Sequence, residues 1–314
     1  MKKTVVVTGG VGLIGFHLCL SLMNSGYKVI CIDNLSTSRK GNLSVLQKNN
    51  LFRYVHCDIS EKMPALSEIE LIYHLACPAS PIHYQKNPVK TIKTNVSGTI
   101  NVLESAKKLD AGVIFTSTSE VYGNPEIHPQ PENYNGNVDT GSPRSCYDEG
   151  KRCAETLCFD YKRQFGIDVS IARIFNTYGP NMADNDGRVV SNFITKALAG
   201  KELSIHGDGT QTRSFCFVED TVKGLKTFIN HYKHFTGPVN LGSTEEISIK
   251  YLAETIIRLT NSSSEIKFSK PAPADPVRRK PDIALAEKTL SWKAAVPLEE
   301  GLVRTINWFR TANR

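Results

Sequence analysis

Tyr147 and Lys151 stand four residues apart in the stretch SCYDEGKRCAE, so a helix would place both side chains on one face. An ammonium group beside a phenol lowers the pKa of the phenol toward neutrality, which would make Tyr147 a usable general base. A tyrosine and a lysine at this spacing are also common on solvated helix faces, so the pair alone is weak evidence. Thr118 strengthens it, because this hydroxyl follows the apolar run GVIFTS (112–117), at the strand end where open α/β sheets bind ligands.

Glu120 follows Thr118 and Ser119 just past the end of the same predicted strand. A carboxylate at the edge of a buried strand is costly unless a partner or a reaction uses it. Glu120 is therefore a candidate functional group.

A glycine array, VTGGVGLIG, places Gly9, Gly12 and Gly15 between the first predicted strand and the first predicted helix. Gly9 would permit a tight turn, Gly12 would let backbone N–H groups approach a pyrophosphate, and Gly15 would allow close helix packing. Asp33 ends the second predicted strand and is placed to bind the ribose hydroxyls of NAD. Together these residues indicate an NAD site, and turn glycines beside a surface aspartate are the weaker alternative.

Further cofactor contacts are expected around this array. Asp58, after the third predicted strand, is a candidate contact for adenine, with a helix N-cap as the alternative. Arg39 and Lys40 keep NADP open as the cofactor. The other residues expected to bind the cofactor, besides Tyr147 and Lys151, are Leu13, Ile14, Asn34, Ile59, Leu75 and Thr94.

The elements that must position these residues follow from short β-branched runs alternating with longer amphipathic stretches. Strands are expected at 4–8, 28–32, 52–56, 71–76, 112–117 and 168–174. Helices are expected at 13–25, 41–48, 89–109 and 145–165. Continuous apolar strands separated by helices indicate an α/β fold, a Rossmann-type doubly wound parallel sheet with helices on both faces.

The chain is expected to divide into a scaffold and a smaller C-terminal lobe. Residues 1–176 would form an NAD-binding Rossmann domain to which 208–243 returns, and 177–314 would mainly form a substrate-binding lobe. Polar or Pro-rich stretches without regular structure are expected at 176–188, 206–213 and 270–282.

Composition narrows the class of protein. The net charge of +7 is spread along 314 residues, and VRRK (277–280) is the one compact basic cluster, so an anionic small molecule suits the chain better than nucleic acid. Eight cysteines without a C-x-x-C pair favour reduced thiols over disulfides or a metal site. The apolar start is too short for a signal peptide, and no apolar run is long enough to span a bilayer, so we expect a soluble, cytoplasmic protein.

Taken together, the NAD array, Thr118, Tyr147 and Lys151 resemble the extended short-chain dehydrogenase/reductase family, whose members transfer a hydride to and from NAD. Glu120 narrows the resemblance, because sugar-nucleotide 4,6-dehydratases carry an Asp-Glu pair after the Thr and 4-epimerases usually carry a small residue. The whole chain resembles the UDP-glucuronic acid decarboxylases, also called UDP-xylose synthases. The motifs that carry this resemblance are PASPIHYQKNP (78–88), GSPRSCYDEGKR (141–152), ARIFNTYGP (172–180), DGRVVSNF (186–193), GTQTRSF (209–215) and RRKPDI (278–283).

The resemblance implies NAD-dependent decarboxylation of UDP-glucuronate to UDP-xylose through a 4-keto intermediate, carried out by a homodimer whose long helices 89–109 and 145–165 pair. Glu120 would repel the carboxylate, protonate C5 through water, or orient Arg279 of the C-terminal lobe. The implied catalytic residues are Thr118, Ser119, Glu120, Tyr147, Lys151 and Arg279. The implied substrate-binding residues are Tyr84, Lys93, Asn176, Arg188, Arg213 and Arg279.

The sequence is also consistent with other products, substrates and reactions. The product could be the 4-keto pentose, the substrate another nucleotide uronate, or the reaction a 4-epimerisation or 4,6-dehydration. A non-catalytic NAD-binding regulator is disfavoured because Tyr147 and Lys151 are both present. Departures from the family pattern, which bear on the nucleotide and the uronic acid, are Phe16, Asn135, Asn181, Ala183 and His206.

Overall fold

Seven parallel strands form the central sheet of the computed structural model, which describes residues 3–183, 186–270 and 276–312. The order across the sheet is β11-β6-β5-β4-β1-β2-β3. The strands are β1 Thr4–Thr8, β2 Lys28–Asp33, β3 Phe52–His56, β4 Leu71–His74, β5 Gly112–Thr118, β6 Val169–Ile174 and β11 Val239–Leu241. The order reverses between β1 and β4, which is the switch point where doubly wound sheets bind ligands.

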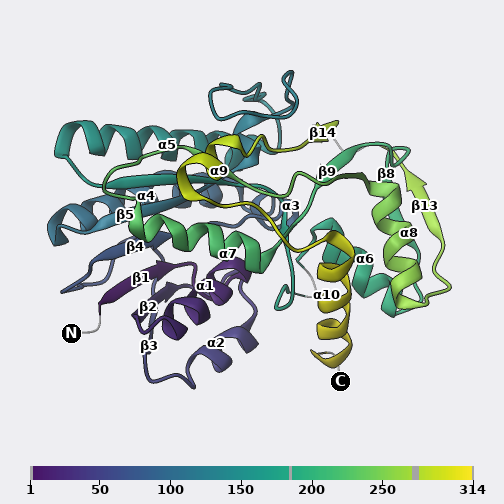
Figure 1. Cartoon of the computed structure of the whole chain (residues 1–314), viewed down its shortest axis with the longest axis horizontal. Coiled ribbons are helices and arrows are strands. Elements are labelled where there is room, and N and C mark those ends of the chain that lie inside the picture. The colour runs from purple at the N-terminus through teal and green to yellow at the C-terminus, as the bar shows by residue number, and fades with distance from the viewer. Residues whose placement is uncertain (1–2, 184–185, 271–275, 313–314) are drawn as a thin grey trace.

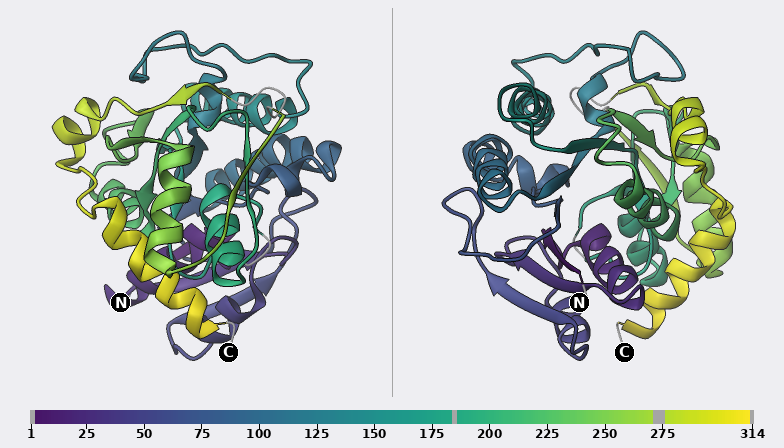
Figure 2. Two further views of the ribbon diagram at one scale, coloured as in Figure 1. Left: turned by 90° about the vertical axis from the view of Figure 1, so that its right-hand side faces the viewer. Right: turned by 60° about the vertical axis from the view of Figure 1, so that its left-hand side comes forward.

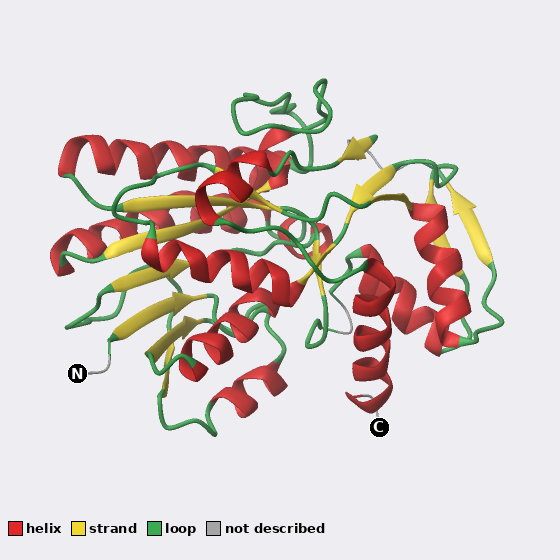
Figure 3. Ribbon diagram, viewed as in Figure 1, coloured by secondary structure: helices red, strands yellow, loops and turns green. Residues whose placement is uncertain are grey.

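Helices cover both faces of this sheet, as Figures 1 and 3 show. On one face lie α4 (Pro88–Leu109) and α5 (Ser145–Phe165), packed on the core cluster that contains Val102, Leu103 and Ala154. On the other face lie α1 (Leu13–Asn24) and α7 (Val218–Thr227), within the larger core cluster that also extends into the C-terminal part of the chain. The expected Rossmann-type α/β fold is confirmed, with strand and helix bounds within two residues of the expectation.

Local sequence signals account for the longest helices. The Asn87 side chain accepts a hydrogen bond from the Lys90 N–H at 3.2 Å, and Pro88 occupies the first turn of α4, where its missing N–H costs nothing. Gly166 ends α5 with a φ of +71°, a conformation that glycine adopts without a Cβ penalty. These caps fix where α4 starts and where α5 ends.

A smaller lobe, which includes α6, β8, α8, β13 and α10, lies beside the carboxyl ends of the strands, to the right in Figure 1 and turned toward the viewer in the left part of Figure 2. Small sheets pair β10 with β7, β9 with β12 and β14, and β8 with β13. Their strands are β7 Thr177–Tyr178, β8 Leu203–His206, β9 Thr212–Ser214, β10 Cys216–Phe217, β12 Glu246–Ser248, β13 Ile266–Ser269 and β14 Arg278–Arg279. The other helices are α2 Lys40–Leu46, α3 Pro81–Tyr84, α6 Val189–Leu198, α8 Ile249–Thr260, α9 Ala284–Leu290 and α10 Leu298–Ala312, with short 3₁₀ turns η1 Ser119–Tyr122 and η2 Phe228–Asn230.

The expectation of irregular structure in three polar or Pro-rich stretches is wrong in part. Within 176–188 the residues Thr177–Tyr178 form β7, within 206–213 the strand β9 begins at Thr212, and within 270–282 the residues Arg278–Arg279 form β14. Each strand is two or three residues long and is defined by pairing with a distant segment, so no local periodicity announces it. The part of the expectation that covers 184–185 and 271–275 lies outside the described residues.

Candidate active site

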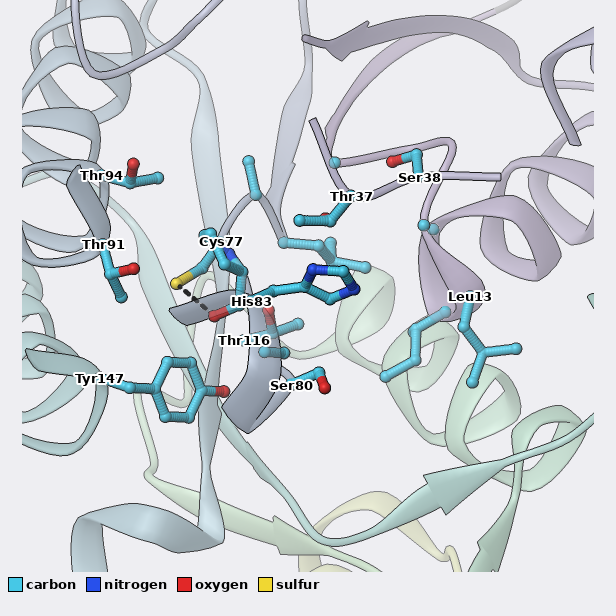
Figure 4. A pocket seen from close by; sticks show the side chains of 18 of the residues that line it. Leu13, Thr37, Ser38, Cys77, Ser80, His83, Thr91, Thr94, Thr116 and Tyr147 are labelled. Atoms are coloured by element: carbon cyan, nitrogen blue, oxygen red, sulfur yellow. Dashed lines mark hydrogen bonds between the residues drawn. The ribbon is translucent and has the colours of Figure 1, made fainter. Parts of the chain in front are cut away.

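A cavity of about 760 Å³ opens at the carboxyl ends of the central strands. Its walls come from the segments that follow β1, β2, β3, β4, β5 and β6, together with parts of α1, α3, α4 and α5. Figure 4 shows Tyr147 reaching into the cavity from one side while Leu13 comes from the opposite side. Of the residues named from the sequence, those that line it are Gly9, Gly12, Leu13, Ile14, Gly15, Asp33, Asn34, Asp58, Ile59, Leu75, Thr94, Thr118, Ser119, Glu120, Tyr147, Lys151, Asn176 and Arg188.

The glycine array forms a tight backbone turn that leaves room for a pyrophosphate. Gly9 has a φ of +69°, and a Cβ there would come within 2.8 Å of the Ala76 Cα. A Cβ on Gly15 would clash with the Gly9 carbonyl, so the start of α1 can approach the loop only because both residues are glycines. Gly12 is the N-cap residue of α1 and faces the cavity, where the unpaired N–H groups of the first turn favour an anion. The array therefore fits the NAD pyrophosphate.

Asp33 at the end of β2 is buried and holds the glycine loop in place. One of its carboxylate oxygens accepts the Val11 N–H at 3.0 Å, and the other accepts the Leu35 N–H at 2.8 Å. Burial raises the pKa of Asp33, although these N–H groups and the Ser38 hydroxyl oppose the rise. The carboxylate lies on the cavity wall, so its proposed contact with a ribose is compatible with this position.

Asp58 sits at the centre of a polar cluster on the cavity wall. It accepts hydrogen bonds from Asn34 Nδ2 at 3.0 Å and Ser60 Oγ at 2.8 Å, and it pairs with Lys90 Nζ at 2.8 Å. Burial opposes the charged form, but the hydrogen bonds from Lys90 and Ser60 lower the pKa of Asp58 to about 2. Asp58 is thus an ionised acceptor at neutral pH. The alternative of a helix N-cap is wrong, because no helix lies in the described segment between β3 and β4; Asp58 accepts the Ser60 N–H at 3.0 Å within a turn.

Tyr147 and Lys151 both lie on α5 and both line the cavity, as their spacing predicts. The expected lowering of the phenol pKa is wrong for this structure, because burial raises the pKa of Tyr147 well above its usual range. The thiol of Cys77 and the carboxyls of Glu120 and Asp148 add to this rise. Lys151 Nζ donates to the Thr116 carbonyl at 2.8 Å, and burial lowers the pKa of Lys151. Tyr147 is therefore protonated at neutral pH in this structure, with the Thr118 side chain as the group that favours its ionisation.

A second phenol supports Tyr147 from behind. The Tyr84 ring stacks on the Tyr147 ring with centroids 5.1 Å apart and an angle of 4° between the planes. Tyr84 is 1% exposed and does not line the cavity, so its expected contact with the sugar does not follow from this arrangement. The stack instead fixes the plane of the Tyr147 ring.

Glu120 lines the cavity at the start of η1 and is held by two guanidinium groups. Arg144 Nη2 donates to its Oε2 at 2.6 Å, and Arg279 Nη1 donates to its Oε1. Burial alone would raise the pKa of Glu120, but Arg279 and Arg144 outweigh it and lower the pKa to about 2. Arg279 is 1% exposed and also donates to the Gly123 carbonyl at 2.8 Å, so it reaches Glu120 from the side away from the cavity.

Three other residues expected to bind substrate differ in their placement. Arg188 lines the cavity, and its guanidinium binds both oxygens of Asp186, at 2.5 Å and 2.7 Å. Arg213 is buried on β9 beside Arg279 of β14, outside the cavity lining. Lys93 points away on the exposed side of α4, where Glu61 lies 4.0 Å from it. The structure thus brings together Glu120, Arg213 and Arg279 but leaves Lys93 apart.

Sequence reasoning missed several residues of the site. Arg144 holds Glu120 and lies three residues before Tyr147, a helical spacing that could have identified it within the motif GSPRSCYDEGKR. Asp148 is also buried beside Glu120, and burial followed by Glu120 raises the pKa of its carboxyl to about 7. The other lining residues that sequence reasoning missed include Cys77, Ser80, His83, Lys90 and Asp186.

The departures from the family pattern lie around the site rather than in it. Phe16 is buried in the core on α1, and Asn181 bonds to Asn42 at 3.1 Å. His206 ends β8, where its Nδ1 lies 3.0 Å from the Ser269 hydroxyl. The Asn135 carbonyl accepts a hydrogen bond from Arg152 at 2.6 Å. None of these four residues lines the cavity.

Other features of the chain bear on its class. All eight cysteines are free thiols. Among the described residues, no group of three or more His, Cys, Asp or Glu side chains is placed to hold a metal ion. Within residues 3–183, 186–270 and 276–312, no helix is both long and apolar enough to cross a membrane.

Two UDP-glucuronic acid decarboxylases match the chain over most of its length. UDP-glucuronic acid decarboxylase 5 of Arabidopsis thaliana is 54% identical, over 95% of this chain and 86% of that protein. UDP-glucuronic acid decarboxylase 1 of Xenopus tropicalis is 50% identical, over 98% of this chain and 72% of that protein.

Solved structures agree on the fold. The UDP-glucose 4-epimerase of Thermotoga maritima superposes with a TM-score of 0.91 at 28% identity, covering 99% of this chain and 100% of that one. The UDP-glucuronic acid 4-epimerase of Bacillus cereus, solved with UDP-glucuronic acid and NAD, superposes with a TM-score of 0.89 at 29% identity, with the same coverage. The model of the NAD dependent epimerase/dehydratase family matches residues 5–242. The chain therefore belongs to the NAD dependent epimerase/dehydratase family and, within it, to the UDP-glucuronic acid decarboxylases.

Proposed function

We propose that this chain converts UDP-glucuronate to UDP-xylose by oxidation at C4, loss of CO2 from the resulting β-keto acid, and reduction at C4. The observation that carries the proposal is Glu120, an ionised carboxylate on the cavity wall that is held by Arg279 from the second lobe. A neutral sugar gives a site no reason to bury this cluster of charges, whereas a substrate with its own carboxylate does. Relatives at 50–54% identity carry the name of this activity.

The chemistry needs a ketone β to the carboxylate, because the ketone accepts the electron pair left behind when CO2 departs. NAD, when bound along the glycine array, supplies the hydride acceptor for C4 and returns the hydride at the end. The chain itself must take a proton from the 4-hydroxyl, stabilise an enolate oxygen and guide a proton to C5.

Tyr147 is the residue that exchanges the proton of the 4-hydroxyl, with its ring plane fixed by Tyr84. Thr118, whose side chain favours the ionised phenol, supplies a second hydroxyl to the developing enolate oxygen. Lys151 adds a buried ammonium group to the same wall, which favours negative charge on the enolate. These three side chains define the C4 end of the reaction.

Glu120 and Ser119 define the carboxylate end. Since the pKa of Glu120 is about 2, it acts at neutral pH as an acceptor that orients a donor, such as a water molecule that protonates C5. An ionised Glu120 beside the substrate also disfavours the substrate carboxylate and favours neutral CO2. Arg188 and Asn176, which line the same cavity, are suited to the diphosphate or sugar oxygens.

The proposal extends to the organisation of the molecule. It places the NAD-binding unit in residues 1–176 with 208–243 returning to it, since β11 and α7 pack with the central sheet. It also describes the protein as a cytoplasmic homodimer that pairs through the outer faces of α4 and α5, an expectation that rests on the family resemblance.

The direct test incubates the purified protein with UDP-glucuronate and NAD, while CO2 release is measured and the nucleotide sugar is identified by NMR. The expected result is one CO2 per UDP-xylose formed, without net consumption of NAD. UDP-galacturonate without CO2 would instead identify a 4-epimerase, the activity named for the structural neighbour from Bacillus cereus. A 4-keto pentose with stoichiometric NADH would identify a decarboxylase that stops before the reduction.

A further inference from the structure

Arg144 links the two chemically active parts of the site. Its side chain, 12% exposed, donates to Glu120 Oε2 at 2.6 Å, and it is the N-cap residue of α5. Its backbone carbonyl accepts the Tyr147 N–H at 2.9 Å and the Asp148 N–H at 3.1 Å in the first turn of that helix. One residue therefore sets the position of Glu120 relative to Tyr147.

The two arginines that hold Glu120 differ in what anchors them. Arg279 belongs to the two-residue strand β14 of the second lobe, while Arg144 belongs to the helix that carries Tyr147 and Lys151. A substrate carboxylate that enters next to Glu120 competes for its guanidinium partners, because a guanidinium group binds one carboxylate in its two-pronged geometry. If Arg279 turns to the substrate, Arg144 is the partner that stays with Glu120.

Other groups around Glu120 oppose its negative charge, so Glu120 needs Arg144 as a partner if Arg279 leaves. Groups that act electrostatically with Glu120 are Arg279 on β14, Arg213 on β9, Arg144, Tyr147 and Asp148 on α5 or at its N-cap, and Tyr84 on α3. Burial and the carboxyl of Asp148 both favour a protonated Glu120, and the three arginines oppose them. Two of the arginines come from the second lobe, on the paired strands β9 and β14.

We infer that Arg144 is a positioning residue that holds Glu120 ionised and aimed at the cavity while Arg279 engages the substrate carboxylate. The inference rests on the proposed decarboxylation and deepens it. It assigns Glu120 the part of a hydrogen-bond acceptor, since a carboxylate held by Arg144 orients a proton donor and does not itself give up a proton. Neither arginine lines the cavity in this structure, so the inference requires the Arg279 guanidinium to leave Glu120 and the Gly123 carbonyl when the substrate binds, while Arg144 stays.

The test compares Arg144→Gln and Arg144→Lys with Arg152→Gln as the matched control. Arg152 lies on the same helix and donates to the Val121 carbonyl at 3.0 Å, next to Glu120 in the chain. We expect Arg144→Gln to lower kcat for CO2 release by at least about tenfold at pH 7 and to move the acidic limb of the kcat profile upward by about 1–3 pH units, the usual effect of losing a neighbouring charge. Arg144→Lys should keep the wild-type profile with a smaller loss of kcat, and Arg152→Gln should match the wild type.

A profile for Arg144→Gln that coincides with the wild type, or an equal shift in Arg152→Gln, would overturn the inference. The Asp148→Asn variant, alone and combined with Arg144→Gln, shows whether titration of Asp148 causes the acidic limb of the kcat profile. An acidic limb that disappears in Asp148→Asn would also overturn the inference. A wild-type protein without CO2 release would refute the proposed function instead. In that case a ¹³C NMR titration of the Glu120 carboxyl, assigned through Glu120→Gln, still tests the role of Arg144. The inference predicts that the pKa of Glu120 rises in Arg144→Gln and does not rise in Arg152→Gln.

Discussion

Two carboxyl groups beside Tyr147 have opposite pKa shifts. The arginines lower the pKa of Glu120 to about 2, whereas burial and then the charge of Glu120 raise the pKa of Asp148 to about 7. One oxygen of Asp148 is buried without a hydrogen-bond partner among the described residues, as a carboxyl that is easily protonated would be. Both carboxyl groups are largely buried, so the neighbouring charged groups, and not solvent exposure, decide that Glu120 is the one that carries the charge.

Glu120→Gln and Arg279→Ala test the carboxylate end of the site. We expect either change to lower kcat for CO2 release by at least about 100-fold, since each removes an oriented charge from the site. NAD binding, measured by calorimetric titration, should stay near the wild-type affinity because the glycine array and Asp33 are untouched. Loss of NAD binding in both variants would show that these residues are assigned to the wrong step.

Asp148→Asn tests the raised pKa through stability. The folded protein keeps the Asp148 proton up to about pH 7, whereas the unfolded chain releases it near 3.8, so the contribution to stability is full below 3.8 and is lost as the pH rises toward 7. Asparagine at position 148 does not ionise, so the variant does not lose this stability as the pH rises. Calorimetry should show a Tm gain of roughly 3 °C or more at pH 8, at about 2–4 °C per kcal/mol, that shrinks as the pH falls to 5. A gain that is equal at both pH values would contradict the assignment.

At the scale of elements, β14 depends on a loop whose Gln130 lies 150 residues before Lys280 in the sequence. The loop after η1 extends past the sheet and meets β14, as Figures 1 and 2 show. Gln130, which is fully buried, donates its N–H to the Lys280 carbonyl at 2.9 Å and accepts the Lys280 N–H on its side chain at 3.0 Å. Its carbonyl also accepts the Asp282 N–H at 3.0 Å. Gln130 thus holds both sides of the residue that follows Arg279.

Gln130→Leu should therefore loosen Arg279 without touching the cavity. Leucine leaves the Lys280 N–H and the Ile127 carbonyl without their side-chain partner, and each of these bonds contributes about 0.5–1.5 kcal/mol. We expect kcat/KM for CO2 release to fall by about tenfold or more while NAD affinity stays unchanged. The control is Asn137→Ala, which removes an amide of the same loop that bonds to Asn124 and not to the β14 segment. Equal activity of the two variants would refute this role of Gln130.

The sequence predicts the elements whose signals are local and misses those that distant contacts define. The strands from β1 to β6 follow from apolar β-branched runs, and the glycine array identifies the NAD loop because its function depends on backbone conformation. The strand β14 has no periodicity of its own. The pair of Arg144 with Glu120 spans 24 residues, and that of Lys90 with Asp58 joins a helix to a loop, so both depend on how loops approach one another. The raised pKa of Tyr147 was missed because it comes mainly from burial, which depends on how distant segments pack around the phenol.

At the scale of the whole molecule, the two lobes divide the chemistry between them. The larger lobe supplies the glycine array after β1, Glu120 on η1 and Tyr147 on α5, and the smaller lobe supplies Arg213 and Arg279 from adjacent strands. An ion pair between Glu120 and Arg279 joins the lobes at the edge of the cavity. Because the charged groups around Glu120 come from both lobes, their arrangement depends on the position of one lobe relative to the other.

The outer faces of α4 and α5 give a further prediction at this scale. The two longest helices lie together on one face of the sheet (Figure 1), and α4 exposes Val89 and Ile92 near its start. We expect light scattering to give a molar mass twice that of one chain, with α4 and α5 protected from hydrogen exchange on their outer faces. A monomer at micromolar concentration would contradict the proposed homodimer and would leave the cavity, which one chain forms alone, unaffected.

The central claim is that oxidation at C4, decarboxylation and reduction at C4 occur in one site. The most direct measurement uses UDP-glucuronate deuterated at C4, with the enzyme in ordinary water, and follows CO2 and the product by mass spectrometry and NMR. The account predicts one CO2 per turnover, UDP-xylose that keeps the deuterium at C4, and a solvent-derived hydrogen at C5. Product that forms without CO2, or that has lost the deuterium from C4, would contradict it.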